Sequence, residues 1–176
     1  MTTNMLVLDI ETDGLLDQMT TIHCAVVKNY LTGEVTEFRP GEIIDFADMA
    51  GMIDGNVVIG HNIISFDLPA IDKWCKKVLP IYDHDPFPKP KMVIDTLVMS
   101  RLLNPDRERP EGLPQKVGPH SLKAWGYRLG LFKGEYGEQD NAWVDFNEDM
   151  LAYCAQDVHV TTEVYKALLK EMQDDV

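Results

Sequence analysis

The sequence has few cysteines and no long apolar run. Cys24, Cys75 and Cys154 are odd in number, lie far apart and sit in apolar stretches, so they indicate neither a disulfide framework nor a zinc cluster. We interpret them as reduced core residues. No stretch of 18 apolar residues is present, and the N-terminus lacks the basic and apolar regions of a secretion signal. These absences argue against a transmembrane or secreted protein, and we expect a soluble protein of the cytoplasm.

Basic residues are also scarce, and they are unevenly placed. The 176 residues include 16 basic and 29 acidic side chains, a formal net charge of −13. Such a charge disfavours nucleic-acid binding, which relies on Lys and Arg to neutralise phosphates. Residues 70–133 nevertheless carry twelve basic and seven acidic side chains. This pattern fits a protein that collects cations at one place and contacts an anionic substrate at another, and it fits solvated surface charge equally well.

The order of apolar patterns predicts a single domain of the α/β or α+β class around a mixed sheet. The first three predicted strands form an antiparallel meander with a turn at Thr32–Gly33. The predicted strands cover residues 5–10, 20–28, 34–39, 56–60 and 92–95. Helices are predicted over residues 46–53 and 68–79 and from Asn147 onward, with a helical or turn-rich piece over 97–103. Eight of the ten prolines fall between residues 80 and 119, which predicts surface loops there.

Two carboxylates follow the first apolar strand in LVLDIETDGL, residues 6–15. Because side chains alternate along a strand, Asp9 and Glu11 project from one face near its end. Taken alone, the pattern is also that of a strand running out into solvent. Asp67 is equally ambiguous, since it precedes Leu68 and Pro69 at a helix start, where an Asp is typically an N-cap.

The last predicted helix contains a further misplaced carboxylate. Asn147 is a suitable N-cap, and Glu148 and Asp149 complement the helix dipole. Asp157 lies inside the apolar stripe of this helix, and Tyr153 lies one turn earlier on its edge. The stripe comprises Met150, Cys154, Val158, Thr161, Val164, Tyr165, Leu168 and Met172. An isolated buried carboxylate must protonate or find a cation, so Asp157 is anomalous as a structural residue.

The four acidic side chains make chemical sense as a set. Asp9, Glu11, Asp67 and Asp157 would repel one another if they were brought together, and divalent cations remove that conflict. Ligands that are all oxygen select Mg²⁺ or Mn²⁺ over zinc. Two such ions about 3.5–4 Å apart can hold the attacking and leaving oxygens of a phosphodiester. The sequence therefore predicts a metal-dependent reaction at a nucleic-acid phosphate.

Three stretches of the chain resemble the three motifs of the DnaQ-like (DEDD) 3′→5′ exonucleases. They are LVLDIETDGL, GHNIISFDLPAI and YCAQDVHVT, and the tyrosine in the third is that of the subclass containing the proofreading domains of family A DNA polymerases. The likeness is closest to bacteriophage polymerases, which HSLKAWGYRLGLFKGEY at 120–136 also resembles. The resemblance implies a ribonuclease H-like α/β fold, with the antiparallel meander plus parallel strands flanked by helices.

The resemblance also implies roles for the acidic residues. Asp9, Glu11 and Asp157 would bind the first of two Mg²⁺ or Mn²⁺ ions, Asp9 would bridge to the second, and Asp67 would hold the second directly or through water. Tyr153 would orient the attacking water, because a tyrosine with a reference pKa near 10 is a poor base at neutral pH.

Substrate contacts are implied at four further positions. Thr12 through its backbone and Leu15 as an apolar wedge against the terminal base match the family, and Asn62 and Phe66 match other contacting positions. We interpret His120 as a structural hydrogen-bonding residue. The expected activity is release of nucleoside 5′-monophosphates from single-stranded or frayed DNA 3′ ends, with a DNA polymerase or another replication protein as a candidate partner, in the host-cell cytoplasm if the chain is phage-encoded.

Other readings remain open from sequence. The chain ends at Val176 without room for polymerase palm or fingers, so it is either freestanding or a fragment of a longer protein. A non-catalytic docking module with this fold is the alternative function. A phosphatase with an Asp nucleophile is disfavoured, since Glu11 stands where a second Asp is needed. The sequence does not distinguish DNA from RNA as substrate.

Overall fold

The computed structural model describes residues 3–41, 43–79, 85–131, 136–139 and 141–174. A five-stranded sheet of order β3-β2-β1-β4-β5 lies at its centre. The strands are β1 (Met5–Thr12), β2 (Ile22–Asn29), β3 (Val35–Phe38), β4 (Val57–Gly60) and β5 (Met92–Asp95). The helices are α1 (Ile43–Ile53), α2 (Asp67–Val78), α3 (Thr96–Leu103), α4 (Leu122–Leu129) and α5 (Glu148–Asp174).

The sheet combines an antiparallel half with a parallel half. β1, β2 and β3 form an antiparallel meander, and β4 and β5 add in parallel on the other side of β1. Gly33 in the β2–β3 turn has a φ of 78°, and its N–H donates to the carbonyl of Asn29. The predicted meander and mixed sheet are therefore confirmed.

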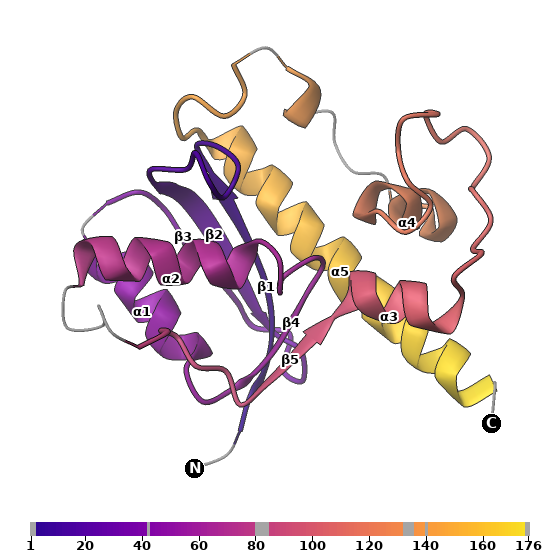
Figure 1. Cartoon of the computed structure of the whole chain (residues 1–176), viewed down its shortest axis with the longest axis horizontal. Coiled ribbons are helices and arrows are strands. Elements are labelled where there is room, and N and C mark those ends of the chain that lie inside the picture. The colour runs from indigo at the N-terminus through magenta and orange to yellow at the C-terminus, as the bar shows by residue number, and fades with distance from the viewer. Residues whose placement is uncertain (1–2, 42, 80–84, 132–135, 140, 175–176) are drawn as a thin grey trace.

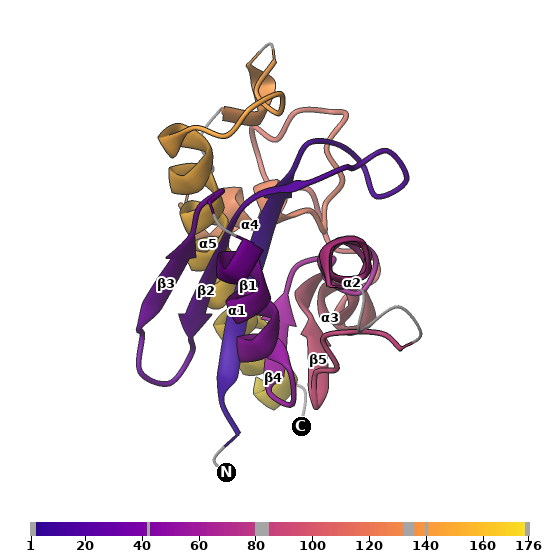
Figure 2. The same ribbon diagram turned by 90° about the vertical axis from the view of Figure 1, so that its left-hand side faces the viewer.

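Helices cover both faces of the sheet (Figures 1 and 2). Leu6, Leu8 and Ile10 of β1 share one apolar cluster with residues of α1 and α2. Val7 joins Cys24 of β2 and residues of α5 in a second cluster on the opposite face. α3 and α4 pack against α5 rather than against the sheet. The alternation of β1 side chains thus directs its even positions to α1 and α2 and its odd positions to α5.

Most predicted elements are confirmed, with ends that differ by at most three residues. Asn147 caps α5, since its Oδ1 accepts the N–H of Met150 at 2.8 Å. Met172 departs from the predicted apolar stripe because its side chain is 45% exposed. The sequence analysis missed α4, which is bounded by local signals: Ser121 Oγ accepts the Ala124 N–H, and Gly130 ends the helix with φ 67°. Residues 80–84 of the first predicted proline-rich loop lie outside the described residues.

The cysteine and membrane expectations can be compared with the described residues. Cys24, Cys75 and Cys154 are buried and form no disulfide, as predicted. Every helix in the described ranges falls short of the combined length and apolar character needed to cross a membrane.

Gly60, the last residue of β4, provides a test of packing. A Cβ at this position would lie 2.6 Å from Cβ of Ile63, which is fully buried. Since Ile63 has no room to move, we expect Gly60→Ala to lower the free energy of unfolding by about 1–3 kcal/mol in urea titrations. Gly51→Ala in α1 is the matched control, because nothing lies within 4 Å of its Cβ. That control should gain about 0.5–1 kcal/mol from better helix propensity; equal stability of Gly60→Ala and the wild type would contradict the close contact.

Candidate active site

Asp9 and Glu11 lie on the α5 side of the central strand. β1 pairs with β4 only from Met5 to Val7, so its end extends beyond its parallel neighbour. A register irregularity follows between Glu11 and Thr12 on the β2 side. The two carboxylates therefore lie on one face of β1, as the strand alternation predicts. They lie at the end of β1 that extends beyond β4.

α5 brings the second part of the site against this strand. Asp157 is 4% exposed and follows Cys154 by one helical turn. The Cys154 thiol lies 3.4 Å from Oδ2 of Asp9 and 3.3 Å from its carbonyl oxygen. Ligand atoms of Asp9, Glu11 and Cys154 all lie within 4.8 Å of one another. Helix and strand are thus in direct contact at the acidic residues.

Asp67 reaches β1 from the first residue of α2. Phe66, and not Asp67, occupies the N-cap position, and no side chain caps this helix. Oδ1 of Asp67 instead accepts the backbone N–H of Ile10 at 3.2 Å. The N-cap interpretation of Asp67 is therefore wrong: its carboxylate points across to the central strand, where the N–H of Ile10 is available to it.

Burial and neighbouring charges disfavour the ionised forms of the Asp67 carboxyl and the Cys154 thiol. Burial raises the pKa of Asp67 to about 7, and the charges of Asp95 and Asp157 add to that rise, while the N–H of Ile10 opposes it. Burial likewise raises the pKa of the Cys154 thiol, helped by its hydrogen bond with Cys24 and by the charges of Asp9 and Glu11. The thiol is thus protonated and able to donate to Asp9.

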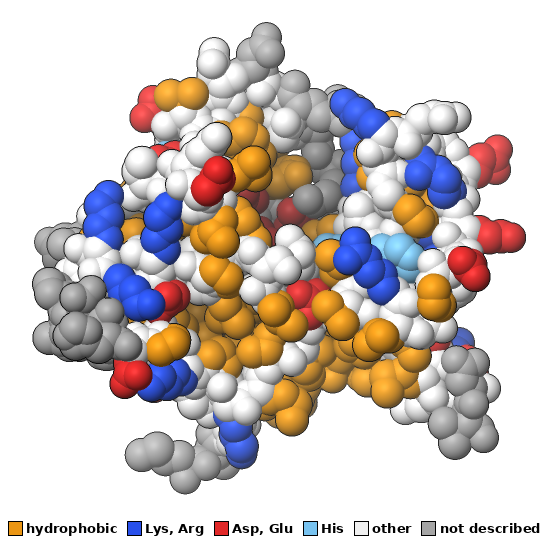
Figure 3. All heavy atoms as spheres, in the orientation of Figure 1, with side chains coloured by type: hydrophobic (Ala, Val, Ile, Leu, Met, Phe, Trp, Pro, Cys, Tyr) orange, Lys and Arg blue, Asp and Glu red, His pale blue; other side chains and the backbone are white. Residues whose placement is uncertain are grey.

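A cavity of about 250 Å³ contains the carboxylates, and an adjoining one of about 360 Å³ is mostly apolar. Figure 3 shows acidic side chains inside a hollow near the middle of this face, bordered by apolar side chains. All nine site residues predicted from sequence line one or the other. The first is lined by Asp9, Ile10, Glu11, His61, Asn62, Phe66, Asp67, Trp143, Tyr153 and Asp157. The second is lined by Glu11, Thr12, Asp13, Gly14, Leu15, Gln18, Phe66 and Trp143.

An aromatic group that the sequence analysis missed borders both cavities. The Tyr153 ring lies 6.0 Å from Trp143 and 5.8 Å from Tyr136, measured between ring centroids. The carbonyl of Trp143 is 3.0 Å from Nε2 of His23 on β2, which ties the segment to the sheet. An isolated Trp in the acidic stretch before α5 was the available signal. His61 was also missed, although it directly precedes Asn62 in the second motif.

Most arginines of the basic middle segment make internal contacts instead of facing the cavities. Arg107 forms a two-bond ion pair with Glu171 and stacks 4.5 Å from the Trp125 ring. Arg109 donates to the carbonyls of Pro114 and Val117. The exposed Arg101 differs, since it lines a cavity of about 510 Å³ that shares His61 and Asn62 with the carboxylate cavity. His120 hydrogen-bonds to Ser100 Oγ at 2.9 Å, in line with its structural interpretation.

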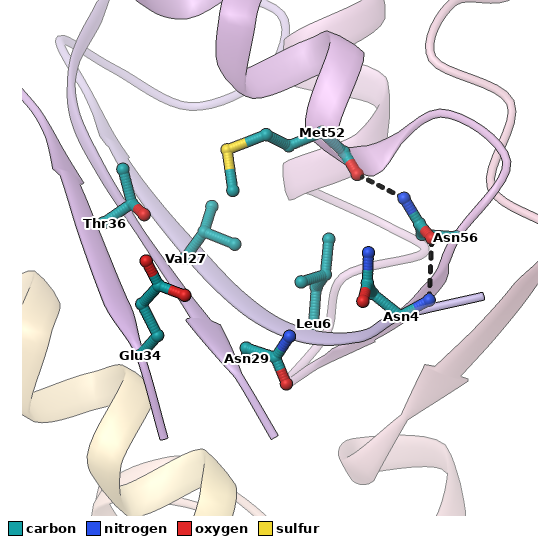
Figure 4. Close-up of a pocket in the computed structure, with 8 residues that line it drawn as sticks. All are labelled: Asn4, Leu6, Val27, Asn29, Glu34, Thr36, Met52 and Asn56. Carbon is teal, nitrogen blue, oxygen red and sulfur yellow. Dashed lines mark hydrogen bonds between the residues drawn. The ribbon is translucent and has the colours of Figure 1, made fainter. Parts of the chain in front are cut away.

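Another cavity, of about 300 Å³, lies at the opposite end of β1 (Figure 4). Its lining includes Asn4, Asn29, Glu34 and Asn56. Asn56 Nδ2 donates to the carbonyl of Met52, and its Oδ1 accepts the N–H of Asn4, so this amide joins α1 to the start of β1. Glu34 is the lone carboxylate of this lining, which makes the cavity unlike the acidic one.

Comparison with known proteins identifies the family of the chain. A family model described as 3′-5′ exonuclease matches residues 8–173. The chain therefore belongs to the 3′–5′ exonuclease family, as the motif resemblance predicted. It is 39% identical over 195 aligned positions to the DNA-directed DNA polymerase of Enterobacteria phage T3, covering 97% of this chain and 27% of that protein. The chain spans about a quarter of the length of the curated relatives it matches.

Solved structures support the fold assignment. Brucella melitensis NrnC with bound Mg²⁺ is similar with a TM-score of 0.65 and 16% identity, over 99% of this chain and 76% of that one. Escherichia coli RNase D, an exoribonuclease involved in structured RNA processing, has a TM-score of 0.61 and 15% identity, over 98% and 40% of the two chains. The predicted ribonuclease H-like fold is thereby confirmed.

The residues of the pocket fit a divalent metal. Its acidic side chains offer carboxylate oxygens, which suit hard ions. The 3′–5′ exonuclease family depends on divalent metals, in agreement with this donor set.

In metal-free protein, the contribution of Asp67 to stability should be lost as the pH rises from about 4 to about 7. The folded state keeps the proton of Asp67 up to a pKa of about 7, whereas the exposed carboxyl of the unfolded chain loses it at its ordinary pKa of 3.8. The stabilising contribution is present below the lower value and is lost as the pH passes the higher one. Asp67→Asn does not titrate, so in EDTA its unfolding free energy should fall less than that of the wild type between about pH 5 and pH 7.5. Equal losses in urea titrations would contradict the raised pKa.

Proposed function

We propose that residues 1–176 form one exonuclease domain that hydrolyses the terminal phosphodiester at DNA 3′ ends, single-stranded or frayed, and releases nucleoside 5′-monophosphates. The observation that carries this proposal is the gathering of Asp9, Glu11, Asp67 and Asp157 from three chain segments around one cavity. The similarity to a phage DNA-directed DNA polymerase favours DNA as the substrate and the cytoplasm of a host cell as the place of action.

The carboxylates act as ligands in this proposal. Asp9, Glu11 and Asp157 would hold one Mg²⁺ or Mn²⁺ ion, and Asp67 together with Asp9 would hold a second. Bound ions supply Lewis acidity, assisting the attacking water and offsetting charge on the departing 3′ oxygen. The Ile10 N–H keeps Asp67 directed at β1, and the Cys154 thiol donates to Asp9. These contacts hold the ligands in place before substrate binds.

The remaining predicted residues surround the substrate. The Tyr153 hydroxyl orients the attacking water, and packing against Trp143 and Tyr136 restricts its ring. Leu15, 70% exposed at the rim of the apolar cavity, wedges against the terminal base, and Phe66 provides an apolar wall beside it. The backbone of Thr12 contacts the DNA substrate. Asn62 contacts the DNA strand at the place where the acidic cavity meets the cavity lined by Arg101.

A polymerase or another replication protein is the proposed partner. The curated relatives are DNA-directed DNA polymerases, and the chain matches 27% of their length, which supports a polymerase as the protein with which this domain works. The low content of basic side chains supports this, because a partner would compensate for weak binding to phosphates.

Removing a first-ion ligand tests the activity. Asp9→Ala or Asp157→Ala should lower Mg²⁺-dependent release of mononucleotides by at least about 1,000-fold, which corresponds to about 4 kcal/mol of transition-state stabilisation. A 5′-labelled DNA strand and its RNA counterpart, resolved on sequencing gels with and without Mg²⁺, report the direction and the preferred sugar. Glu163→Ala on the surface of α5 is the matched control. Wild-type rates in both aspartate variants would refute the site, and an inactive wild-type chain would favour the docking module.

Tyr153→Phe separates water orientation from metal binding. Loss of the hydroxyl should lower kcat by about 10- to 100-fold, the range typical of groups that orient reacting partners around a metal. Mn²⁺ binding, followed by electron paramagnetic resonance, should stay within twofold of the wild type because no ligand is removed. Tyr30→Phe, whose ring pairs with Tyr165 away from the cavity, controls for loss of a hydroxyl. An unchanged kcat in Tyr153→Phe would contradict the role.

A further inference from the structure

Asp95, a buried carboxylate outside the four proposed ligands, accepts hydrogen bonds from two separate segments. It is 4% exposed and ends β5. As the N-cap of α3, its Oδ1 accepts the N–H groups of Leu97 and Val98. The same oxygen accepts the N–H of Asn62 at 2.9 Å, and Oδ2 accepts that of Ile64 at 3.2 Å. An N-cap needs only the bonds to its own helix, so the other two require a separate explanation.

The register of the sheet places Asp95 beside the connection that leads to Asp67. Gly60, the end of β4, is the strand partner of Asp95. Beyond Gly60 the chain leaves the sheet, and its backbone N–H groups need acceptors from elsewhere. Asn62 has a positive φ of 64°, an uncommon conformation for a residue other than glycine. The Asp95 carboxylate satisfies the donors on both sides of buried Ile63 and so holds this conformation.

Thr96, the next residue, extends the same contact. Its hydroxyl donates to the carbonyl of Gly60 at 3.2 Å and lies 2.9 Å from Nδ1 of His61. Because the one hydroxyl proton is given to Gly60, the ring of His61 must donate from Nδ1. Asp95 and Thr96 together therefore contact Gly60, His61, Asn62 and Ile64.

The segment held in this way determines where three site residues lie. The carbonyl of Asn62 accepts the N–H groups of Ser65 and Phe66, and the carbonyl of Ile63 accepts that of Leu68. The turn thus passes without a break into the first turn of α2. A shift at Asn62 would move Phe66 and Asp67 with it.

We propose that Asp95 is a positioning residue of the exonuclease site, which fixes the turn of residues 60–66 and thereby places the Asp67 carboxylate and the Asn62 side chain at the cavity. The inference rests on the proposed function, because it assigns Asp95 to the placement of a metal ligand. Asp95 itself does not line the carboxylate cavity. Its hydrogen bonds act on the site through the backbone of the turn, and its charge adds to the rise in the pKa of Asp67.

Asp95→Asn removes one part of this contact and keeps the shape of the side chain. The amide oxygen can still accept at the position of Oδ1, so the cap of α3 and the bond from Asn62 persist. The amide NH₂ then faces the N–H of Ile64, and two donors cannot bond. The variant therefore releases one anchor of the turn without removing the helix cap. Asp95→Ala is the second variant, and it removes both the anchor of the turn and the cap of α3.

The experiment compares kcat, the KM for single-stranded DNA, the Mg²⁺ concentration for half-maximal rate and Mn²⁺ binding without substrate. For Asp95→Asn we expect kcat to fall by about 10- to 100-fold and the metal requirement to rise by about 3- to 10-fold. The KM for single-stranded DNA should also rise, because Asn62 and Phe66 move with the turn. Asp95→Ala should show larger changes in the same direction. Rates are normalised to the folded fraction, taken from thermal unfolding.

Asp72→Asn is the matched control. Asp72 lies on α2, where its Oδ1 accepts the N–H of Phe87 and its Oδ2 accepts Nζ of Lys76. The same substitution therefore keeps one bond and removes the other, away from the turn. It should lower stability without changing the metal requirement. Asp67→Asn is measured alongside: if it leaves metal binding and kcat unchanged, the proposed function fails. If Asp67→Asn is impaired while Asp95→Asn and Asp95→Ala match the wild type per folded molecule, the inference about Asp95 is overturned.

Discussion

Electrostatic repulsion among carboxylates in one partly buried pocket is the constraint that the rest of the site must offset. The fold brings Asp9, Glu11, Asp67 and Asp157 together from three segments far apart in the chain. Burial raises the pKa of Asp67 to about 7, and the charges of Asp95 and Asp157 add to that rise, so this carboxyl favours its protonated form. Divalent cations would restore the ionised form and relieve the repulsion. Metal binding, protonation and stability are therefore coupled at this place.

The central strand is the common frame for these groups. Its odd positions carry Asp9 and Glu11 towards α5, and its even positions anchor the core against α1 and α2. Its end extends beyond β4, so the Ile10 N–H is free of strand pairing on that side and binds Asp67. The strand β1 thus hydrogen-bonds to Asp67 of α2 and also faces Asp157 of α5. Its extension past β4 is what opens the pocket at the strand end.

The arginine side chains of residues 70–133 mostly make contacts within the protein. Arg107 pairs with Glu171 and stacks on Trp125, and Arg109 closes the loop that carries it. The basic middle segment is therefore mainly structural, which neither reading of its charge had anticipated. Arg101 remains exposed beside the acidic cavity. Under the proposed function, metal ions and a partner protein would supply much of the attraction for a DNA strand.

Local periodicity was enough to predict much of this protein. Alternation placed Asp9 and Glu11 on one face, helical spacing placed Asp157 on the buried stripe of α5, and turn residues identified the meander. Tertiary structure decided the rest: the direction of the Asp67 carboxylate, the packing of Trp143 against Tyr153, and the contact of Asp95 with the turn after β4. The physical reason is that periodicity specifies which face a side chain occupies. Which distant backbone donors that face meets depends on strand register and helix packing, which no local pattern encodes.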